Sequence, residues 1–420
     1  MMSIKSWITV LLFCACPVGA VWSADIDVLP GEGTLAAAIA AASPGDTLLL
    51  RFGAYSGGAI TLNKSLTIRS YKRSDPVISG SGDFTIQGAG ISVTLQGLTF
   101  EKTVRVNQAA EVRLLENTFV PTLYLENYKS SEGDGSLFII GNYFLNGAIS
   151  GISSNDAYIA GNVINNGFIN GSAPVWIVGN DVICNCNTAH LIYISSSGTV
   201  RIIGNRVRNY IYNNYSYSYG IYASSPQALI SGNIVQIFVN PNNAYLDYSA
   251  GIHSASGTAA TIINNVISGG TKRNTGISLS VSSAKVYGNI IENFNTAITV
   301  NSSTYLADIG HNICFNNGTN NCNSANGNLA VDPKFVDRTN FRLAADSPAI
   351  NAGPPDNTFA DLDRTRNDIG AHGGPWSIGQ YDIQRSTDNR APYVYPLFDI
   401  NSSLSGSDLR IRALGVARMR

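Results

Sequence analysis

The sequence predicts an all-β solenoid of about 11–12 stacked coils, each with three short strands, with a short capping helix at its N-terminal end. The first observation is a motif, apolar-x-apolar-x-Gly-Asn-x-apolar, that recurs nine times at intervals of 18 to 32 residues. The second is that the apolar residues around each asparagine are spaced by two, as in strands. The third is composition, since only 13% of residues are charged and 41 are glycine. The asparagines of the motif are Asn117, Asn142, Asn162, Asn180, Asn205, Asn233, Asn265, Asn289 and Asn312.

The motif describes two strands joined by a tight corner. In VRIIGNRV, Val200 and Ile202 face inward before the corner, and Val207 faces inward after it. Because Gly and Asn tolerate the left-handed backbone conformation, Gly-Asn can make the corner without a long loop. Stacked coils would align the asparagines into a ladder, each side-chain amide donating to the carbonyl of the next. Replacing a central asparagine should cost about 1–3 kcal/mol, because its neighbour loses a buried partner.

The segment before the motif predicts two or three further coils and a cap. TLLLRFGAY, ITLNKSLTIRS, PVISGSG and VTLQGLTF carry the same strand spacing. Ahead of them, Thr34 opens the alanine-rich run LAAAIAAA, which Ser43 and Pro44 stop. This run predicts a short helix that covers the open end of the core.

The ends of the chain differ from the repeat region. Residues 1–20 have a lysine, a short apolar run and small residues, which predicts a secretory signal peptide with cleavage as late as residue 24. A lipid anchor on Cys16 is not favoured, and no apolar run predicts a membrane span. We expect the solenoid, its cap and its closing coils over 25–375, and a tail or cap over 376–420. The expected location is extracellular, periplasmic or the cell surface.

Four cysteines follow the predicted signal peptide. Cys314 and Cys322 bracket a short loop and could form a disulfide in an oxidising compartment. Cys184 and Cys186 are too close in sequence for an easy bridge, so free or loosely paired thiols are expected there.

Two segments resemble right-handed parallel β-helix proteins of the pectin-lyase-like kind. AAIAAASPGDTLLLRFGAY looks like the cap and first coil of that group, and DPKFVDRTNFRLAADSPAINAG followed by DLDRTRNDIGAHGG is similar to the ending of many secreted bacterial β-helix proteins. The resemblance covers about residues 28–375 and implies a right-handed parallel β-helix. It does not imply an activity, because the paired aspartates and the Arg-x-Lys motif of the hydrolases and the Asp-Pro-His-Asp motif of the epimerases are absent. If the protein is an enzyme, it should resemble a polysaccharide lyase.

In this fold a groove follows the sheet after the variable corner, and outward side chains align there from coil to coil. Alignment of the repeats predicts one outward row, composed of Ser153, Tyr193, Tyr222, His253, Ser278 and Thr299. Tyrosine rings suit sugars, because the apolar face of a pyranose packs on the ring while the hydroxyl forms hydrogen bonds. The candidate substrate-binding residues are Tyr193, Tyr217, Tyr219, Tyr245, Asp247, Tyr248 and Arg273. Packing and loop coverage are an equally good explanation for these tyrosines.

A catalytic interpretation centres on His253, Lys272 and Tyr222. β-Elimination needs a base beside a carboxylate and a cation for the resulting anion, so His253 or Tyr222 would move the proton and Lys272 would neutralise the charge. A single outward histidine is more often inert. His190 and His311 rank lower, His311 because it occupies the Gly position of a repeat.

No cofactor or metal is expected. Asp361, Asp363 and Asp368 could hold Ca²⁺, but a hydrogen-bonded turn explains the pattern as well. The near-neutral net charge of -1 argues against nucleic acid. The predicted function is a secreted protein that binds an extracellular polysaccharide, with uronates as one candidate, and cleavage stays open. The alternative is a non-catalytic surface or envelope protein for structure or adhesion.

Overall fold

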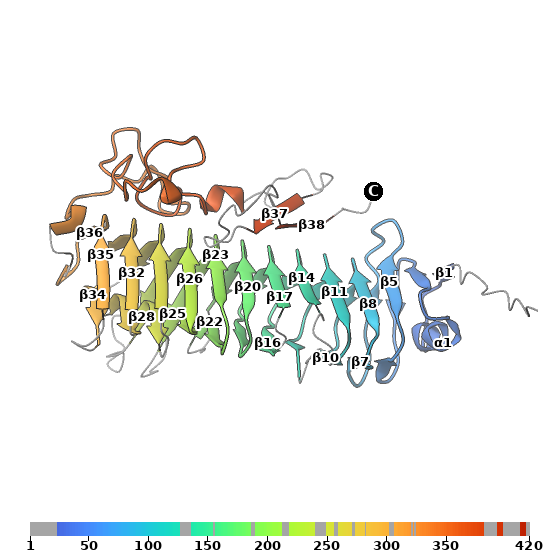
Figure 1. Ribbon diagram of the computed structural model, residues 1–420. Coiled ribbons are helices and arrows are strands. Elements are labelled where there is room, and N and C mark those ends of the chain that lie inside the picture. Colours follow the sequence, from blue (N-terminus) through green and yellow to red (C-terminus); the bar gives the residue numbers. More distant parts are fainter. Residues whose placement is uncertain are drawn as a thin grey trace, which may run out of the picture.

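The computed structural model describes residues 23–381 apart from 127–135, 154–155, 186–189, 212–217, 240–248, 256–258, 271–273, 282, 302–305, 321 and 323–324. Beyond residue 381 it describes only the backbone of two strands, β37 (Tyr393–Leu397) and β38 (Arg412–Val416), which pair antiparallel. Three long parallel sheets enclose one core, as predicted: the fold is a right-handed parallel β-helix (Figure 1). The predicted signal peptide lies outside the described residues. No helix within them has the length and hydrophobicity to cross a bilayer.

Sheet A has 13 strands and contains the apolar run before each asparagine corner. In order along the stack they are β1 (Asp25–Val28), β2 (Thr47–Leu50), β5 (Leu66–Ser70), β8 (Ser92–Gln96), β11 (Glu111–Leu115), β14 (Ser136–Ile140), β17 (Asp156–Ala160), β20 (Val175–Val178), β23 (Val200–Ile203), β26 (Gln227–Ser231), β29 (Ala259–Ile263), β32 (Ser283–Tyr287) and β35 (Leu306–Gly310).

Sheet B has 12 strands and begins directly after each asparagine. Its strands are β3 (Ala54–Tyr55), β6 (Val77–Ile78), β9 (Thr99–Phe100), β12 (Thr118–Phe119), β15 (Tyr143–Phe144), β18 (Val163–Asn165), β21 (Asp181–Cys184), β24 (Arg206–Ile211), β27 (Ile234–Val239), β30 (Val266–Gly269), β33 (Ile290–Glu292) and β36 (Ile313–Phe315).

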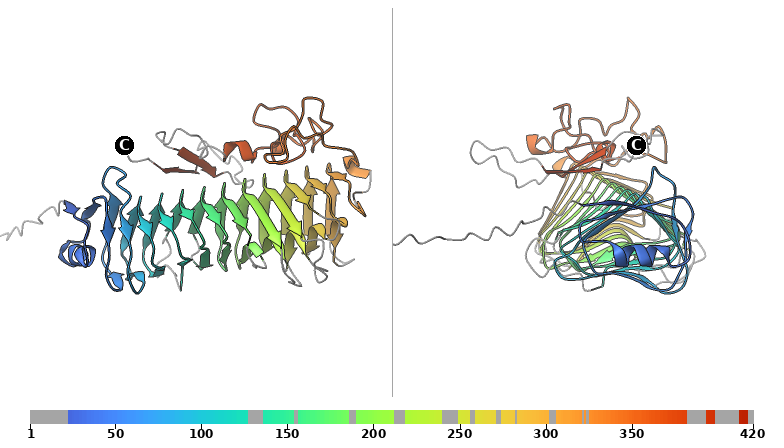
Figure 2. Two further views of the ribbon diagram at one scale, coloured as in Figure 1. Left: turned by 180° about the vertical axis from the view of Figure 1, so that it is seen from behind. Right: turned by 90° about the vertical axis from the view of Figure 1, so that its right-hand side faces the viewer.

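Sheet C has 11 strands and follows the variable corner. Its strands are β4 (Ile60–Leu62), β7 (Phe84–Gln87), β10 (Val104–Gln108), β13 (Leu123–Tyr124), β16 (Ile149–Ile152), β19 (Ile169–Gly171), β22 (His190–Ser195), β25 (Tyr219–Ser224), β28 (Ala250–Ala255), β31 (Thr275–Ser280) and β34 (Thr296–Val300). Viewed along the stack, the sheets form the sides of one continuous tube (Figure 2).

The core is filled by equivalent side chains stacked from coil to coil. At the first inward position of sheet B, the rings of Phe100, Phe119 and Phe144 stack with centroids 5.3 and 4.9 Å apart. Their exposure is at most 1%. Burial of an apolar residue at the same position in every coil explains why the sequence spacing predicts the strands so directly.

The asparagines at the corner between sheets A and B form a hydrogen-bonded row. Each Nδ2 donates to the Oδ1 of the next asparagine at 2.9 to 3.1 Å. Each backbone N–H donates to the same Oδ1. Asn328, in the sequence Gly327-Asn328, adds a tenth member that the motif search missed because no strand precedes it. The positive φ belongs to the residue before each asparagine, as in Gly204 at 65°, and not to the asparagine itself.

The N-terminal cap is the expected helix, α1 (Thr34–Ala41). Thr34 is its first residue, and the Thr34 hydroxyl donates to the Gly31 carbonyl at 3.0 Å. Leu35 and Ile39 are buried on the core, so the helix covers the apolar end of the tube.

Residues 331–381, here called the strap, do not form the expected closing coils. They fold back along the outside of the A–B corner, toward the middle of the tube (Figure 1). Phe341, Ala349 and Ile369 pack on outward residues of sheet B, and Trp376 and Tyr381 pack on outward residues of sheet A. The strap contains two 3₁₀ turns, η2 (Asn357–Phe359) and η3 (Ile378–Gln380), and a third, η1 (Ala325–Gly327), precedes it.

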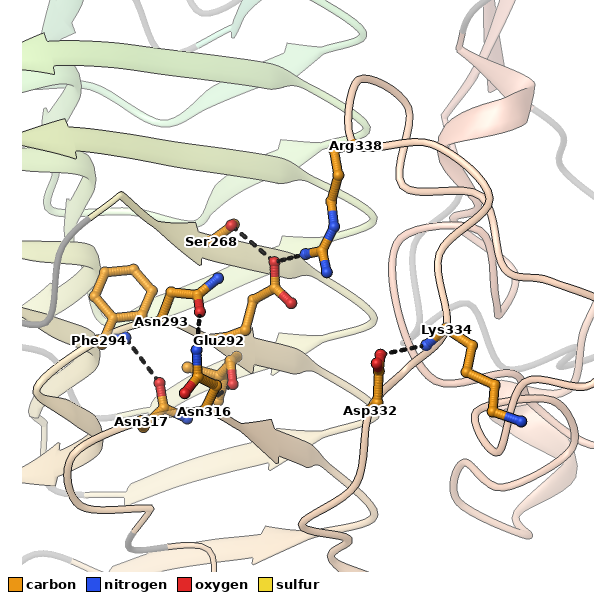
Figure 3. Close-up of polar contacts among 10 residues, drawn as sticks. Ser268, Glu292, Asn293, Phe294, Asn316, Asn317, Asp332, Lys334 and Arg338 are labelled. Carbon is orange, nitrogen blue, oxygen red and sulfur yellow. Dashed lines mark hydrogen bonds and ion pairs between the residues drawn. The ribbon is translucent and has the colours of Figure 1, made fainter.

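Polar contacts fix the register of the strap on the coils. Asn264 and Asn367 exchange two hydrogen bonds between their side-chain amides, each 3.0 Å long. Glu292 on β33, with an exposure of 0%, accepts from Ser268 at 2.9 Å and forms an ion pair with Arg338 of the strap (Figure 3). Because a buried carboxylate needs partners, Arg338 of the strap supplies one to Oε1 of Glu292, while Oε2 has no hydrogen bond to any described residue.

The cysteines follow the predictions only in part. Cys314 and Cys322 form the expected disulfide. Cys184 is also disulfide-bonded, which makes the expectation of a free or loosely paired thiol at this position wrong. Cys186 lies outside the described residues.

Candidate functional site

The outward row predicted on sheet C is in register over five coils. Tyr193 pairs with Tyr222, Tyr222 with His253, His253 with Ser278, and Ser278 with Thr299. The expectation for Ser153 is wrong. Asn170 is the neighbour of Tyr193, and Ser153 follows the end of β16, where the register between β16 and β19 shifts.

Five rings form one contiguous group on this face, here called the aromatic cluster: His190, Tyr193, Tyr219, Tyr222 and His253. Tyr193 and Tyr222 stack with centroids 4.4 Å apart and planes 15° apart. Tyr219 stacks on His190 at 4.9 Å and on His253 at 4.7 Å. His190 and Tyr193 both lie on β22, and Tyr219 and Tyr222 both lie on β25, so each of these two coils contributes two rings. The five side chains are half-buried.

The stacking changes what the aromatic cluster can offer a ligand. Since the rings of Tyr193 and Tyr222 cover each other, the faces between them are not available to a pyranose. Their side chains occupy outward positions of sheet C and are half-buried. We therefore expect the tyrosine hydroxyls to form hydrogen bonds with a sugar while the ring edges contact it, instead of the packing of a pyranose on the ring face that the sequence predicts.

Burial shifts the pKa of two members of the aromatic cluster. Burial raises the pKa of Tyr222, with a further contribution from Tyr193, so the phenol stays protonated. Burial, together with the nearby His190, lowers the pKa of His253 to about 4. His253 is therefore neutral at neutral pH. Its Nδ1 is buried and makes no hydrogen bond to any described residue.

The other predicted site residues lie outside the described residues. They are Tyr217, Tyr245, Asp247, Tyr248, Lys272 and Arg273. In sequence they fall in the segments that directly precede β25, β28 and β31, the strands carrying Tyr222, His253 and Ser278.

The aspartates considered for Ca²⁺ form turns in the strap. Asp361 accepts from the backbone N–H groups of Asp368 and Gly374, and Asp363 accepts from the N–H and hydroxyl of Thr365. Burial raises the pKa of Asp361 and of Asp368. Within the described residues, no group of three or more His, Cys, Asp or Glu side chains is arranged to hold a metal.

A second outward surface was missed, although the asparagine spacing could have located it. Four residues before successive asparagines, sheet A presents a stack of aromatic rings flanked by arginines: Arg113, Phe138, Tyr158, Trp176 and Arg201. Phe138 and Tyr158 stack at 5.3 Å, and the guanidinium of Arg201 lies 4.5 Å from the Trp176 ring centroid. Trp176 is thus a regular member of this row, as its repeat position suggests. At the other end of sheet A, the same position holds Lys285 and Asp308, and Tyr287 lies two residues after Lys285 on the same strand.

Comparison with known proteins gives matches at the level of solved structures. No family model matches the chain, and no curated protein matches it. The pectate lyase Pel9A is 15% identical, with 84% of this chain and 97% of that chain covered and a TM-score of 0.38. A PL6 family polysaccharide lyase, Pedsa3628 from Pseudopedobacter saltans, is 15% identical over 74% of this chain and 87% of that chain, with a TM-score of 0.39. The PL6 family alginate lyase AlyGC is 19% identical over 69% of this chain and 39% of that chain, with a TM-score of 0.26.

The fold and its outward side chains define a class: a right-handed parallel β-helix protein with outward aromatic rings on sheets A and C. Similarity at these TM-scores says nothing about activity, so the function is argued from the residues of this chain.

Proposed function

We propose that this protein is secreted and binds an extracellular polysaccharide along the outer face of sheet C. The observation that carries the proposal is the aromatic cluster, in which rings from three successive coils are in register and stack on one another. A polysaccharide is itself a linear repeat, so a row of equivalent groups along the stack can contact successive sugar units. Ser278 and Thr299 extend the row by two further hydroxyls.

The lowered pKa of His253 favours binding over cleavage. A lyase needs a base whose pKa is near the working pH. With a pKa of about 4, His253 is neutral and can accept a hydrogen bond, but it is a weak base. We therefore assign His253 and Tyr222 to ligand contact. Uronate units are the sugars that Lys272 and Arg273 would select, since cations pair with carboxylates.

The test measures binding and cleavage in the same samples. Purified protein is titrated with alginate, pectate, chondroitin and neutral glycans by calorimetry, and unsaturated product is followed by ultraviolet absorbance. We expect binding to at least one polysaccharide without product. Tyr222→Ala should weaken binding about tenfold, the effect of losing one or two hydrogen bonds and the ring contact.

Tyr143→Ala is the matched control, because Tyr143 is a 38% exposed tyrosine on sheet B, away from the aromatic cluster. Equal affinity of the two variants would refute the role of sheet C. Failure to bind any of the polysaccharides would refute the proposal and leave the alternative, a surface protein for structure or adhesion.

A further inference from the structure

A cavity of about 410 Å³ lies between the strap and the outer face of sheet A, near the C-terminal end of the tube. Its volume is within the range of small-molecule sites. Sheet A contributes Lys285 and Tyr287 from β32 and Asp308 from β35, and the strap contributes Asp356 and Phe359. Because the two walls are more than 40 residues apart in sequence, only docking of the strap creates the cavity.

The cavity has hydrogen-bond acceptors with free capacity. The Tyr287 hydroxyl donates to Oδ2 of Asp308. Asp356 uses Oδ1 to accept from the N–H and hydroxyl of Thr358, both at 2.8 Å. Within the part of the chain that the structure describes, the second oxygen of each carboxylate has no hydrogen bond. Each can therefore accept from a ligand hydroxyl.

Donors and apolar surface complete the lining. Lys285 lines the cavity, and its charge contributes to the lowered pKa of Asp356 after the hydrogen bonds from Thr358, so its ammonium lies near enough to act on the same ligand. The rings of Tyr287 and Phe359 meet at 63° with centroids 6.5 Å apart, and Pro354 and Pro355 extend the apolar wall. Burial, followed by Asp308, raises the pKa of Tyr287 to about 12, so the phenol keeps its proton and continues to donate to Asp308.

His311 closes the cavity at the corner of the last coils. Its backbone has φ 53°, and its backbone N–H donates to the carbonyl of Asn326 at 2.8 Å. The imidazole lies over Gly327, where an added Cβ would be 2.5 Å from Nδ1. Among the described residues this buried Nδ1 has no hydrogen-bond partner. His311 therefore forms the turn before Asn312 and also brings to the cavity a ring nitrogen, Nδ1, that can form a hydrogen bond with a ligand.

We propose that this cavity binds one unit of a neutral saccharide. Carboxylates that each retain an acceptor oxygen, an ammonium donor and an apolar wall suit a ring that carries hydroxyls on its edges and C–H groups on its faces. Two carboxylates against one ammonium disfavour an anionic uronate. The site lies on sheet A and the strap, so it is independent of the polysaccharide surface on sheet C.

The experiment titrates the full chain with cello-, malto-, manno- and xylo-oligosaccharides and, as charged comparisons, with oligoguluronate and glucosamine. Binding is followed by calorimetry and by the thermal unfolding midpoint, which rises when a ligand binds only the folded state. We expect a neutral oligosaccharide to bind and oligoguluronate to leave this site empty. Asp308→Asn and Asp356→Asn should each weaken neutral binding about tenfold or more, because hydrogen bonds to charged groups are the stronger ones.

Asp27→Asn is the control, since Asp27 is an exposed carboxylate on β1, at the opposite end of sheet A. Asp308→Asn retains an acceptor oxygen for Tyr287, so an unchanged unfolding midpoint without ligand verifies its fold. Binding of glucosamine alone, binding of no neutral saccharide, or equal affinity of all three variants would each overturn the proposal. Loss of neutral binding in Tyr222→Ala, with Asp308→Asn unaffected, would assign that binding to sheet C and overturn it as well.

Discussion

Replacement of Asn205 by alanine tests whether the asparagine row stabilises the tube. Asn205 is 0% exposed. Its Nδ2 donates to the Ile177 carbonyl at 2.8 Å and to Asn233 at 3.0 Å, and its Oδ1 accepts two hydrogen bonds from Asn180, each 2.9 Å long. In Asn205→Ala the backbone N–H of Asn180 loses its acceptor, which costs about 1–3 kcal/mol. The other three hydrogen bonds, at about 0.5–1.5 kcal/mol each, bring the expected loss to about 2.5–7.5 kcal/mol. This exceeds the loss of about 1–3 kcal/mol expected from the orphaned neighbour alone.

Urea unfolding followed by circular dichroism measures this loss. The control is Asn63→Ala, because Asn63 is an exposed asparagine between β4 and β5, outside the row, and should change stability by less than about 0.5 kcal/mol. Comparison of midpoints requires equal slopes, since a solenoid can unfold in parts. If Asn205→Ala lowers the free energy of unfolding by less than about 1 kcal/mol, the row is not the stabilising element described above.

Three further outcomes follow from the strap and the aromatic cluster. Gly204→Ala should release the strap, because Gly204 has φ 65° and an added Cβ would lie 2.3 Å from the Tyr381 ring. Hydrogen exchange of the Tyr381 amide should then accelerate, and unchanged protection would contradict this packing. Arg338→Ala should lower the free energy of unfolding by about 1–2 kcal/mol, less than for a fully buried ion pair because Arg338 is more than half exposed. Adding Glu292→Gln should recover part of that loss, and strictly additive effects of the two substitutions would refute an interaction between Arg338 and Glu292. Burial lowers the pKa of His253 in the folded protein to about 4 from its usual 6.5, so the unfolded state takes up the proton first and the folded state loses stability as the pH falls from 6.5 to 4. His253→Gln should show a shallower fall of the urea midpoint over this range, and an identical fall would argue against the burial.

The coils were predictable because every coil repeats the same solution. Val200, Ile202 and Val207 have equivalents in each unit, so the apolar spacing identifies strands without knowledge of long-range contacts. The Gly-Asn corner was predicted, but not which of its two residues adopts the left-handed conformation, because Gly and Asn both tolerate it and spacing alone does not distinguish them. Asn328 does not match the repeat motif, because its corner is present but a 3₁₀ turn replaces the strand that precedes the corner in other coils.

The strap and the cavity were not predictable from the repeats. Phe341, Trp376 and Tyr381 are isolated aromatic residues in an irregular segment, and the residues that they cover are outward residues of distant coils. For the candidate site, the repeat alignment predicts that Tyr193, Tyr222 and His253 are neighbours. It does not predict the ring orientation, which depends on stacking between coils, or the Tyr287–Asp308 contact, which became part of a cavity only through the strap.

The strap also determines how the coils can assemble and come apart. In a simple solenoid each coil interacts with its two neighbours, so folding can start anywhere and one end can fray alone. Here the contact between Asn264 and Asn367 spans 103 residues, and Tyr381 reaches the coil of Gly204. The strap follows the coils in sequence, so it can dock only after they have stacked, and Ile203 and Ile263 stay exposed to water until then. Once docked, it joins the coils from Gly204 to Ile313 into a single cooperative unit, so fraying of the C-terminal coils requires the strap to detach first.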